Sequence, residues 1–270
     1  MSKKTNTNGI VWWSGPSELD GAPIALVVVG LKQSTNRKTG DMVQTYIIRT
    51  DTDPVAAVQS GADASICGAC PHRYREHTEI RTRGRGANRR TEIVKVRRRT
   101  CYVNLGKGVR AVYGCLTRGG YLQPDARGMG YLAKAAGRPL RMGSYGDPAA
   151  VPVAVWHSLV AYLRPEKRTG YTHQWRDSRF ESFRTLCMAS CDSAADVVDA
   201  ETAGWRAFHV LPVDAPAPER QVHCPSDPSG TVHVSCEQCG QCAGSGGRFT
   251  RSVWIRAHGP AKRFVRLATV

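Results

Sequence analysis

The sequence lacks any run of about twenty consecutive apolar residues, and it does not begin with a positively charged segment followed by a hydrophobic core. The first absence argues against a membrane span, and the second argues against a secretory signal. We therefore expect an intracellular protein that has no membrane partner. A reducing compartment would keep its 10 cysteines as thiols unless a metal bound them, so the cysteines predict metal ligation in place of a disulfide scaffold.

Acidic residues are also few. The chain has 22 Asp and Glu against 38 Lys and Arg, which gives a formal net charge of +16. A surface with this excess of positive charge attracts polyanions, and the commonest of these is nucleic acid, either DNA or RNA. With 270 residues the chain can bury the core of one large domain or of a domain with an appended lobe.

The densest cysteine motif lies near the C-terminus, where Cys236, Cys239 and Cys242 follow one another at intervals of three. This step lets one short loop direct three thiolates at an iron-sulfur cluster, with the more distant Cys224 as the fourth ligand. Three cysteines and a histidine, here His258, also make a closed zinc site. Buried free thiols or disulfides are the alternative, but packing alone seldom produces such regular spacing. A metal centre is therefore favoured, and the choice between iron-sulfur and zinc stays open.

A second cysteine motif begins at Cys67 and Cys70, which are separated by Gly-Ala and followed by Pro-His, and Cys101 lies further along the chain. These three thiols predict a second metal centre. A further side chain or a non-protein group would complete its ligand set. The candidate side chains are His72, Cys187 and Cys191.

Between Cys70 and Cys101 the chain is strongly basic, and Gly84 and Gly86 mark the tip of a predicted β-hairpin. Guanidinium groups bind phosphate oxygens bidentately, and their charge releases counterions. The hairpin therefore predicts a nucleic-acid-binding element, and a solvated loop is the alternative. The residues assigned to binding are Arg81, Arg83, Arg85, Arg89, Arg90, Arg97, Arg98 and Arg99.

The N-terminal part predicts a lobe built on a hairpin. Residues 23–30 and 42–49 are β-branched runs with a turn at 36–41 between them. The first eleven residues are polar and predict a frayed end. Asp53 and Pro54 predict the start of a helix that ends at Gly61. We divide the chain into the hairpin lobe (1–63), a cysteine-rich segment with the basic hairpin (64–104), and a larger domain (105–270).

From residue 140 onward, short apolar strands alternate with helices, a pattern typical of parallel βα units. Several such units in succession predict an α/β fold with a full or partial (β/α) barrel. The expected strands cover 140–145, 169–175, 186–190, 205–211 and 252–256.

In such barrels the catalytic groups lie on the loops that follow the strand carboxyl ends. Asp147, His173 and Asp192 occupy such positions and are the catalytic candidates. Both aspartates also precede helices, so helix capping is the alternative for them. A core histidine is the alternative for His173. Trp175 would offer an indole face on which a nucleobase could stack.

The order of these motifs resembles cysteine-rich proteins of unknown role that bacteriophages and plasmids carry. The resemblance rests on Cys-x2-Cys-Pro at Cys67, Gly-Ser-Tyr-Gly-Asp-Pro before Ala149, Tyr-Thr-His-Gln-Trp ending at Trp175, and a cysteine-rich tail before His258-Gly259. It covers roughly Arg49 to Gly259. It implies a protein of the cytoplasm of a bacterial host cell.

Two enzyme families are more distantly similar. The arrangement looks like the radical S-adenosylmethionine barrels, which implies S-adenosylmethionine as a cofactor beside an iron-sulfur cluster. Those enzymes carry Cys-x3-Cys-x2-Cys, whereas here Cys101 lies beyond the arginine hairpin. Base-exchanging transglycosylases are also similar, because they combine a barrel, two aspartates at its mouth and a zinc held by three cysteines and a histidine.

Two functions fit these features, and a phage inhibitor or structural protein that binds a host partner is a third alternative. The first is an enzyme that acts on nucleic acid, with base modification at a barrel mouth that holds Asp147 and Asp192. The second is a non-catalytic nucleic-acid-binding protein whose metals staple its loops. If Asp147, His173 and Asp192 converge on one pocket, an enzyme is favoured; if each aspartate only caps a helix, the binding function is favoured.

Overall fold

The computed structural model describes residues 5–34, 36, 38–259, 262 and 265. It is a mixed α/β structure with two larger sheets and one two-stranded ribbon. The first sheet has the strand order β6 (Tyr121–Leu122), β1 (Asn6–Pro16), β2 (Pro23–Val29), β3 (Val43–Arg49), β7 (Leu140–Tyr145) and β8 (Arg168–Thr169). The second has the order β12 (Val222–His223), β13 (Val253–Arg256), β11 (Ala207–Leu211), β10 (Met188–Cys191) and β9 (Tyr171–Thr172).

The two sheets meet at Gly170, which separates β8 from β9. The Gly170 carbonyl accepts a hydrogen bond of 2.9 Å from the Met188 amide, so the pairing with β10 begins at the junction itself. β3, β7 and β8 are parallel to one another, and so are all five strands of the second sheet. Parallel strands place their carboxyl ends at one edge, and ligands commonly bind there.

The predicted N-terminal hairpin is confirmed, because β2 and β3 pair antiparallel from Ile24↔Arg49 to Val29↔Gln44. The frayed start is wrong for the part of it that is described. Residues 6–16 form β1, which pairs antiparallel with β2. Its polar N-terminal residues precede a buried centre at Ile10 and Val11, and backbone pairing with β2 runs from Gly9 onward.

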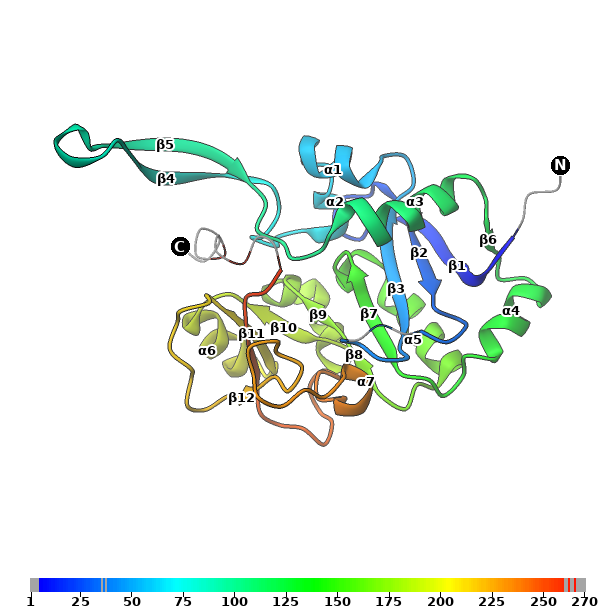
Figure 1. Ribbon diagram of the computed structural model, residues 1–270. Coiled ribbons are helices and arrows are strands. Elements are labelled where there is room, and N and C mark those ends of the chain that lie inside the picture. The colour runs from blue at the N-terminus through cyan, green and yellow to red at the C-terminus, as the bar shows by residue number, and fades with distance from the viewer. Residues whose placement is uncertain (1–4, 35, 37, 260–261, 263–264, 266–270) are drawn as a thin grey trace.

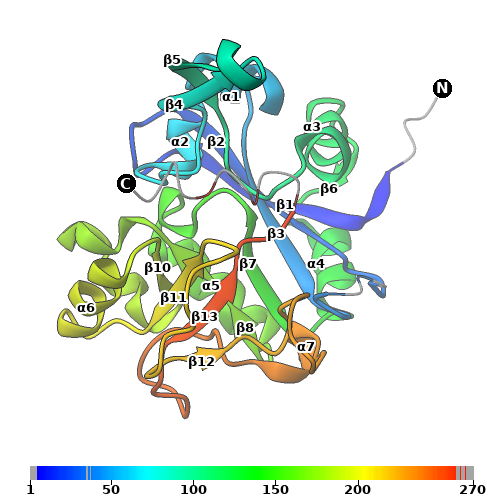
Figure 2. The ribbon, with the colours of Figure 1, turned by 60° about the vertical axis from the view of Figure 1, so that its left-hand side comes forward.

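The helices cover the sheets and the connections between strands (Figures 1 and 2). They are α1 (Pro54–Ser60), α2 (Ala64–Cys67), α3 (Arg110–Thr117), α4 (Ala126–Ala133), α5 (Val153–Leu163), α6 (Ala194–Thr202) and α7 (Cys236–Cys239). Short 3-10 turns lie at η1 (Gly86–Asn88), η3 (Pro148–Ala150), η4 (Gln174–Arg176) and η5 (Ser178–Thr185), and a π-helical turn lies at η2 (Leu105–Val109). Asp53 caps α1 as expected, and Gly61 ends it at φ +87°.

Trp156 of α5 links the main core to the edge where the strands end. Its side chain is fully buried, and its indole Nε1 donates to the Pro148 carbonyl at 2.8 Å. An indole that large packs many carbon contacts, and its polar end needs a partner when it is buried. The helix therefore holds the turn that follows β7 in place.

The basic hairpin is confirmed as a ribbon of β4 (Arg75–Arg83) and β5 (Arg90–Arg98), paired antiparallel along its length. It extends away from the body of the molecule (Figure 1). Gly84 and Gly86 have φ of +86° and +58°, a left-handed conformation that glycine adopts without a side-chain clash.

The predicted division at residues 63 and 104 stays a prediction. β3 of the first segment pairs with β7 of the third, so the two share one sheet. None of the helices formed by the described residues combines the length and the hydrophobicity that a membrane crossing requires.

Candidate active site and cysteine-lined cavity

The three catalytic candidates lie at the carboxyl ends of neighbouring strands. Asp147 follows β7, His173 follows β9 and Asp192 follows β10. The Asp147 Oδ2 accepts a hydrogen bond from the His173 amide at 2.8 Å, and the Asp192 Oδ2 lies 3.1 Å from the His173 Nε2. His173 therefore joins the two aspartates at one place, which is the convergence that favours an enzyme.

His72 completes this group from a distant part of the chain. Its Nε2 lies 2.8 Å from the Asp192 Oδ1, and its Nδ1 lies 2.8 Å from the Thr100 hydroxyl. The Asp192 carboxylate thus bridges two imidazole rings with its two oxygens. Asp192 is buried, and both histidines are largely shielded. We refer to His72, His173 and Asp192 as the His-His-Asp group.

Electrostatics favour the ionised form of the central pair. Burial of Asp192 alone would raise the pKa of its carboxyl, but the charge of His173 and the hydrogen bonds from both histidines lower the pKa below its usual range. Burial disfavours a charged His173 ring, but Cys70 and Asp192 raise its pKa well above the ordinary value. An anionic carboxylate therefore faces a site that stabilises positive charge.

A divalent cation is one way to supply that charge. One ligand atom from each member of the His-His-Asp group lies within 4.8 Å of the other two, and among the described residues no other three His, Cys, Asp or Glu side chains meet this condition. Bonds of about 2.1 Å to an octahedral ion would place neighbouring ligand atoms about 3 Å apart, which the 2.8 and 3.1 Å separations match. The Thr100 hydroxyl contacts the His72 Nδ1 and so fixes the orientation of the ring, as hydrogen-bond partners of metal-bound histidines do.

The Asp147 carboxylate holds neighbouring backbone and side-chain groups in place through hydrogen bonds. Its Oδ1 accepts from the Ala149 amide at 3.0 Å, which caps the turn η3, and its Oδ2 also accepts from the Gln174 Nε2 at 3.1 Å. Capping, the alternative considered for both aspartates, therefore holds for Asp147. Asp192 does not cap α6, because Ser193 is the N-cap of that helix.

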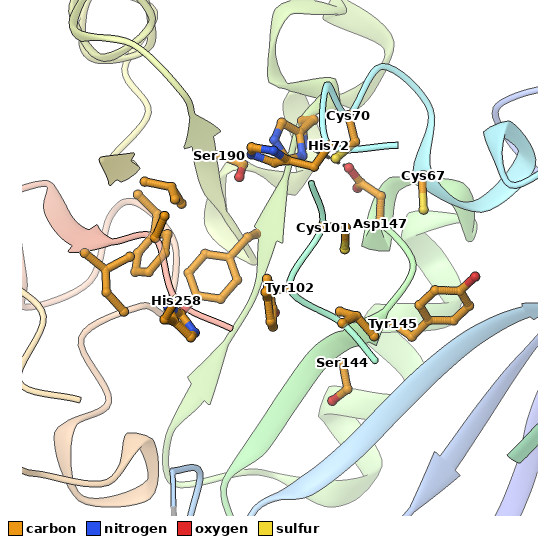
Figure 3. Close-up of a pocket in the computed structure, with 18 of the residues that line it drawn as sticks. Cys67, Cys70, His72, Cys101, Tyr102, Ser144, Tyr145, Asp147, Ser190 and His258 are labelled. Carbon is orange, nitrogen blue, oxygen red and sulfur yellow. Dashed lines mark hydrogen bonds between the residues drawn. The ribbon is translucent and has the colours of Figure 1, made fainter. Parts of the chain in front are cut away.

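A cavity of about 180 Å³ begins at this group and continues to the C-terminal cysteines. Figure 3 shows Cys70, His72, Asp147 and Ser190 gathered at one end, with Tyr102 and His258 further along. Tyr171 and Phe208 line the wall, with ring centroids 4.3 Å apart. Such a shape, largely apolar with a few polar groups at its ends, is typical of a small-molecule or base pocket.

The first cysteine motif lies beside the His-His-Asp group. Cys67, Cys70 and Cys101 line the cavity, and burial raises the pKa of both the Cys67 and the Cys101 thiols. No three cysteine sulfurs of the described chain lie within 4.8 Å of one another. Cys187 and Cys191, which were candidates to complete this set, are buried thiols whose pKa burial also raises. His72, the third candidate, has both ring nitrogens engaged by Asp192 and Thr100.

Two of the four cysteines of the second motif, Cys224 and Cys236, line the far end of the cavity. The nearby charges of Cys224, Cys236 and Cys239 all raise the pKa of Cys242, although burial is the larger cause. No three of these sulfurs lie within 4.8 Å of one another in the described part of the chain. None of the 10 cysteines forms a disulfide.

His258 contacts a lysine at this end. Its Nε2 lies 2.8 Å from the Lys38 Nζ, and its Nδ1 lies 3.2 Å from the Arg256 carbonyl, so the neutral ring donates from Nδ1 and accepts at Nε2. Burial, and then the charge of Arg141, lower the pKa of Lys38, whereas Cys236 and Cys224 oppose that change. The predicted role of His258 as a metal ligand would require it to release Lys38.

The residues assigned to nucleic-acid binding fall into two groups. Trp175 is only 5% exposed, its Nε1 donates to the Ser190 carbonyl, and the Arg176 guanidinium lies 3.8 Å from its ring centroid. It packs in the core and does not present an open stacking face.

On the ribbon, ion pairs with Glu79 or Glu92 engage Arg81, Arg83 and Arg98. Arg97 lies over the Tyr74 ring, and Arg99 donates to the Val103 carbonyl. Arg85, Arg89 and Arg90 are exposed and make no ion pair to a described residue.

Several residues of the site were missed by the sequence analysis. Thr100, Tyr102, Lys38 and Arg141 line the cavity but belong to no recognisable motif. His72 was considered only as a partner of the cysteines. Its place directly after Cys70-Pro71 was the one available signal, because that turn directs it toward the strand ends.

Asp227 holds the loop before the C-terminal cysteines. Its buried carboxylate accepts hydrogen bonds from the Arg256 amide (2.9 Å) and from the amide and hydroxyl of Ser229 (both 2.8 Å), and it lies 2.9 Å from the His223 Nε2. These donors outweigh burial and lower the pKa of Asp227 to about 2.

We expect Asp227→Asn to lower the free energy of unfolding by about 2 kcal/mol at neutral pH, because hydrogen bonds to a buried charge are lost. A depressed carboxyl pKa stabilises the fold fully above the unfolded value near 4, and this stabilisation is lost as the pH falls through about 2. The difference between wild type and variant should therefore shrink below pH 4. Urea unfolding at pH 7, 5 and 3 measures it, with exposed Asp199→Asn as the control, and a pH-independent difference would contradict the assignment.

Comparison with known proteins gave no match, whether the chain was compared with family models, with curated proteins or with solved structures.

Proposed function

We propose that the protein is a metal-containing enzyme that acts on nucleic acid and modifies a base at the mouth of the cavity. The observation that carries this proposal is the His-His-Asp group, a preorganised pair of imidazoles on one carboxylate at the carboxyl ends of β9 and β10. A divalent ion held there would act as a Lewis acid or would activate a bound water. The residues themselves supply orientation: Thr100 holds His72, and Asp147 holds the His173 backbone.

The arginine ribbon would supply affinity for the substrate. It leaves the body near the site, since Arg99 at its base donates to the carbonyl of Val103, a residue that lines the cavity. Phosphate contacts by its exposed arginines are independent of sequence and would hold DNA or RNA near the cavity. We propose in addition that the strands form part of a barrel around the cavity.

The cysteines would bind iron-sulfur clusters or zinc. A tetrahedral zinc with bonds of about 2.3 Å brings its sulfurs to within about 3.8 Å of each other. A four-iron cluster is larger and accepts thiolates that are further apart, and among the described residues no three cysteine sulfurs lie within 4.8 Å of one another. If the first cysteine motif bound an iron-sulfur cluster, S-adenosylmethionine could bind beside that cluster in the cavity. The free thiols fit a reducing bacterial cytoplasm.

The test is to express the protein in bacterial cells, digest their DNA and RNA to nucleosides, and compare them by mass spectrometry with cells that express Asp192→Asn. Expression in cells supplies any small-molecule co-substrate. We expect a nucleoside of altered mass that depends on the wild-type protein. Identical nucleosides in both cultures would contradict the enzyme.

The exposed arginines favour a second function, a nucleic-acid-binding protein without catalysis. Asp147, which acts as a cap and a backbone clamp, fits that function equally well. Tight, salt-dependent binding without any modified nucleoside would establish it.

We expect Cys239→Ser to remove about one metal centre and to destabilise the fold in the same variant, because ligand loss and unfolding are coupled at structural metal sites. Anaerobic purification followed by metal and sulfide analysis measures the first effect, and thermal unfolding measures the second. Cys115→Ser is the control, because Cys115 belongs to neither motif. Unchanged metal content in Cys239→Ser would exclude the C-terminal centre.

A further inference from the structure

The far end of the cavity has an excess of positive charge. Lys38, Arg141 and His258 line it there. Asp147 is the only acidic side chain among the described residues that line the cavity, and it lies at the opposite end (Figure 3). The Lys38 Nζ lies 2.8 Å from the His258 Nε2, and the Arg141 Nη2 donates to the Tyr102 hydroxyl at 3.0 Å. Neither cation forms an ion pair with a carboxylate of the described chain.

One nitrogen at this end has no partner. The Arg141 Nε is buried and makes no hydrogen bond to a described residue. The neighbouring charges also disfavour one another. Burial and then the charge of Arg141 lower the pKa of Lys38, and burial and then the charge of Lys38 lower the pKa of His258. An unpaired buried donor costs free energy, and so do adjacent cations that no anion screens. An anion bound between Lys38 and Arg141 would remove both costs.

The backbone holds these side chains in place from three separate segments. Arg141 lies on β7, between β3 and β8 of the first sheet. Lys38 lies in the loop between β2 and β3, where its carbonyl accepts a hydrogen bond of 3.1 Å from the Cys236 amide. His258 follows β13, and its Nδ1 lies 3.2 Å from the Arg256 carbonyl. The positive end is therefore preorganised, which lowers the entropy cost of binding a ligand.

The walls of the cavity indicate what the rest of a ligand would be. Tyr171 and Phe208 line it with ring centroids 4.3 Å apart, and Val210 and Ile255 add aliphatic surface. Apolar walls of this kind bind the carbon body of a small molecule, while a few polar groups fix its orientation. Guanidinium and ammonium groups each donate several hydrogen bonds to the oxygens of a phosphate or a carboxylate. The cavity therefore fits a molecule with an aromatic or apolar body and an oxyanion at one end.

We propose that the cavity binds such a small molecule, and that Lys38 and Arg141 hold its oxyanion group. An oxyanion held there would direct the body of the molecule along the apolar walls toward His72, at the opposite end of the cavity (Figure 3). In the enzyme proposed above, this molecule is the co-substrate, and that assignment rests on the proposed function. The binding site itself requires neither the enzyme activity nor a metal at any cysteine.

The experiment measures the affinity of the purified protein for three probes by isothermal titration calorimetry. Phenyl phosphate and benzoate each join an aromatic ring to an oxyanion, and benzyl alcohol is their neutral counterpart. We expect at least one of the two anions to bind at least about 10-fold more tightly than benzyl alcohol, because the neutral probe forms no hydrogen bonds between charged groups. The anion that binds more tightly identifies phosphate or carboxylate as the group that the site accepts.

Variants test whether the two cations hold the anion. Lys38→Met and Arg141→Met each remove one charge and should weaken binding of the tighter anion at least about 10-fold. Lys38→Arg keeps the charge and should lose less. Lys167→Met is the matched control, because it changes the net charge equally, and Lys167 donates to the Gln238 carbonyl outside the cavity lining. We expect wild-type affinity from that control.

Circular dichroism checks that each variant is folded, and if Arg141→Met unfolds, Lys38→Met and the neutral probe decide. The inference would be overturned if benzyl alcohol bound as tightly as the anions, if the wild-type protein bound neither anion, or if folded Lys38→Met kept the wild-type affinity. Anion binding as expected, without any altered nucleoside in cells, would leave this site in place and contradict the proposed enzyme. An altered nucleoside without anion binding would have the opposite meaning.

Discussion

Replacing Asp192 by Asn should strongly reduce base modification, with the fold intact, and should remove any divalent ion that the His-His-Asp group binds. The amide keeps the shape of the side chain but has no charge, and one of its two positions can no longer accept a bond from a histidine. The loss of a catalytic acid, base or metal ligand typically costs 10² to 10⁴-fold in rate, so we expect at least about 10²-fold less modified nucleoside. Asp199→Asn on α6 is the control, since that side chain is exposed and pairs only with Arg176 at 3.3 Å.

Metal content decides how Asp192 acts. If the group binds a metal, Asp192→Asn loses about one ion per chain and loses activity together. If His173 and Asp192 work as an acid-base pair without metal, activity falls while metal content stays the same. Full activity in a folded Asp192→Asn variant would contradict both mechanisms and would favour the non-catalytic function.

The sequence predicted the elements whose signals are local. β7 has the predicted bounds, 140–145, because an apolar run ends there at Gly146-Asp147-Pro148. The glycines at its tip predicted the arginine ribbon. The helix α6 begins at Ala194, directly after Ser193, as expected. Placement of Asp147, His173 and Asp192 at strand carboxyl ends followed from the same local patterns.

Local patterns could not predict which residues contact one another within the site. The contact between His72 and Asp192 joins residues 120 positions apart, and that between Lys38 and His258 joins residues 220 positions apart. Both contacts are made by turns and loops outside the strands that the packing of distant segments brings together, and no spacing in the sequence reports this. Trp175 shows the converse, because an aromatic residue near a site is as easily a core residue, and here its indole is buried and donates to the Ser190 carbonyl of β10.

The second large effect is expected from the ribbon. Replacing Arg85, Arg89 and Arg90 together by alanine should weaken binding to DNA and RNA of every sequence, because no carboxylate of the described residues pairs with these exposed guanidinium groups. Arg81, Arg83 and Arg98 already pair with Glu79 or Glu92, so they would have to give up an ion pair before contacting a phosphate. Arg99 is a poor test position, because its loss also frees the Val103 carbonyl in the cavity wall.

Salt dependence separates a specific ribbon contact from a general charge effect. Each phosphate contact that is lost lowers the slope of log affinity against log salt by about 0.9 on duplex DNA, so three lost contacts should lower it by nearly 3. The matched control replaces Lys32, Arg127 and Lys134, three exposed cations outside the ribbon, and changes the net charge by the same amount. We expect that control to keep the wild-type slope in electrophoretic titrations at two salt concentrations. Equal slopes for wild type and the ribbon variant would mean that the arginines are a solvated loop, and affinity for nucleic acid would then have to come from another surface.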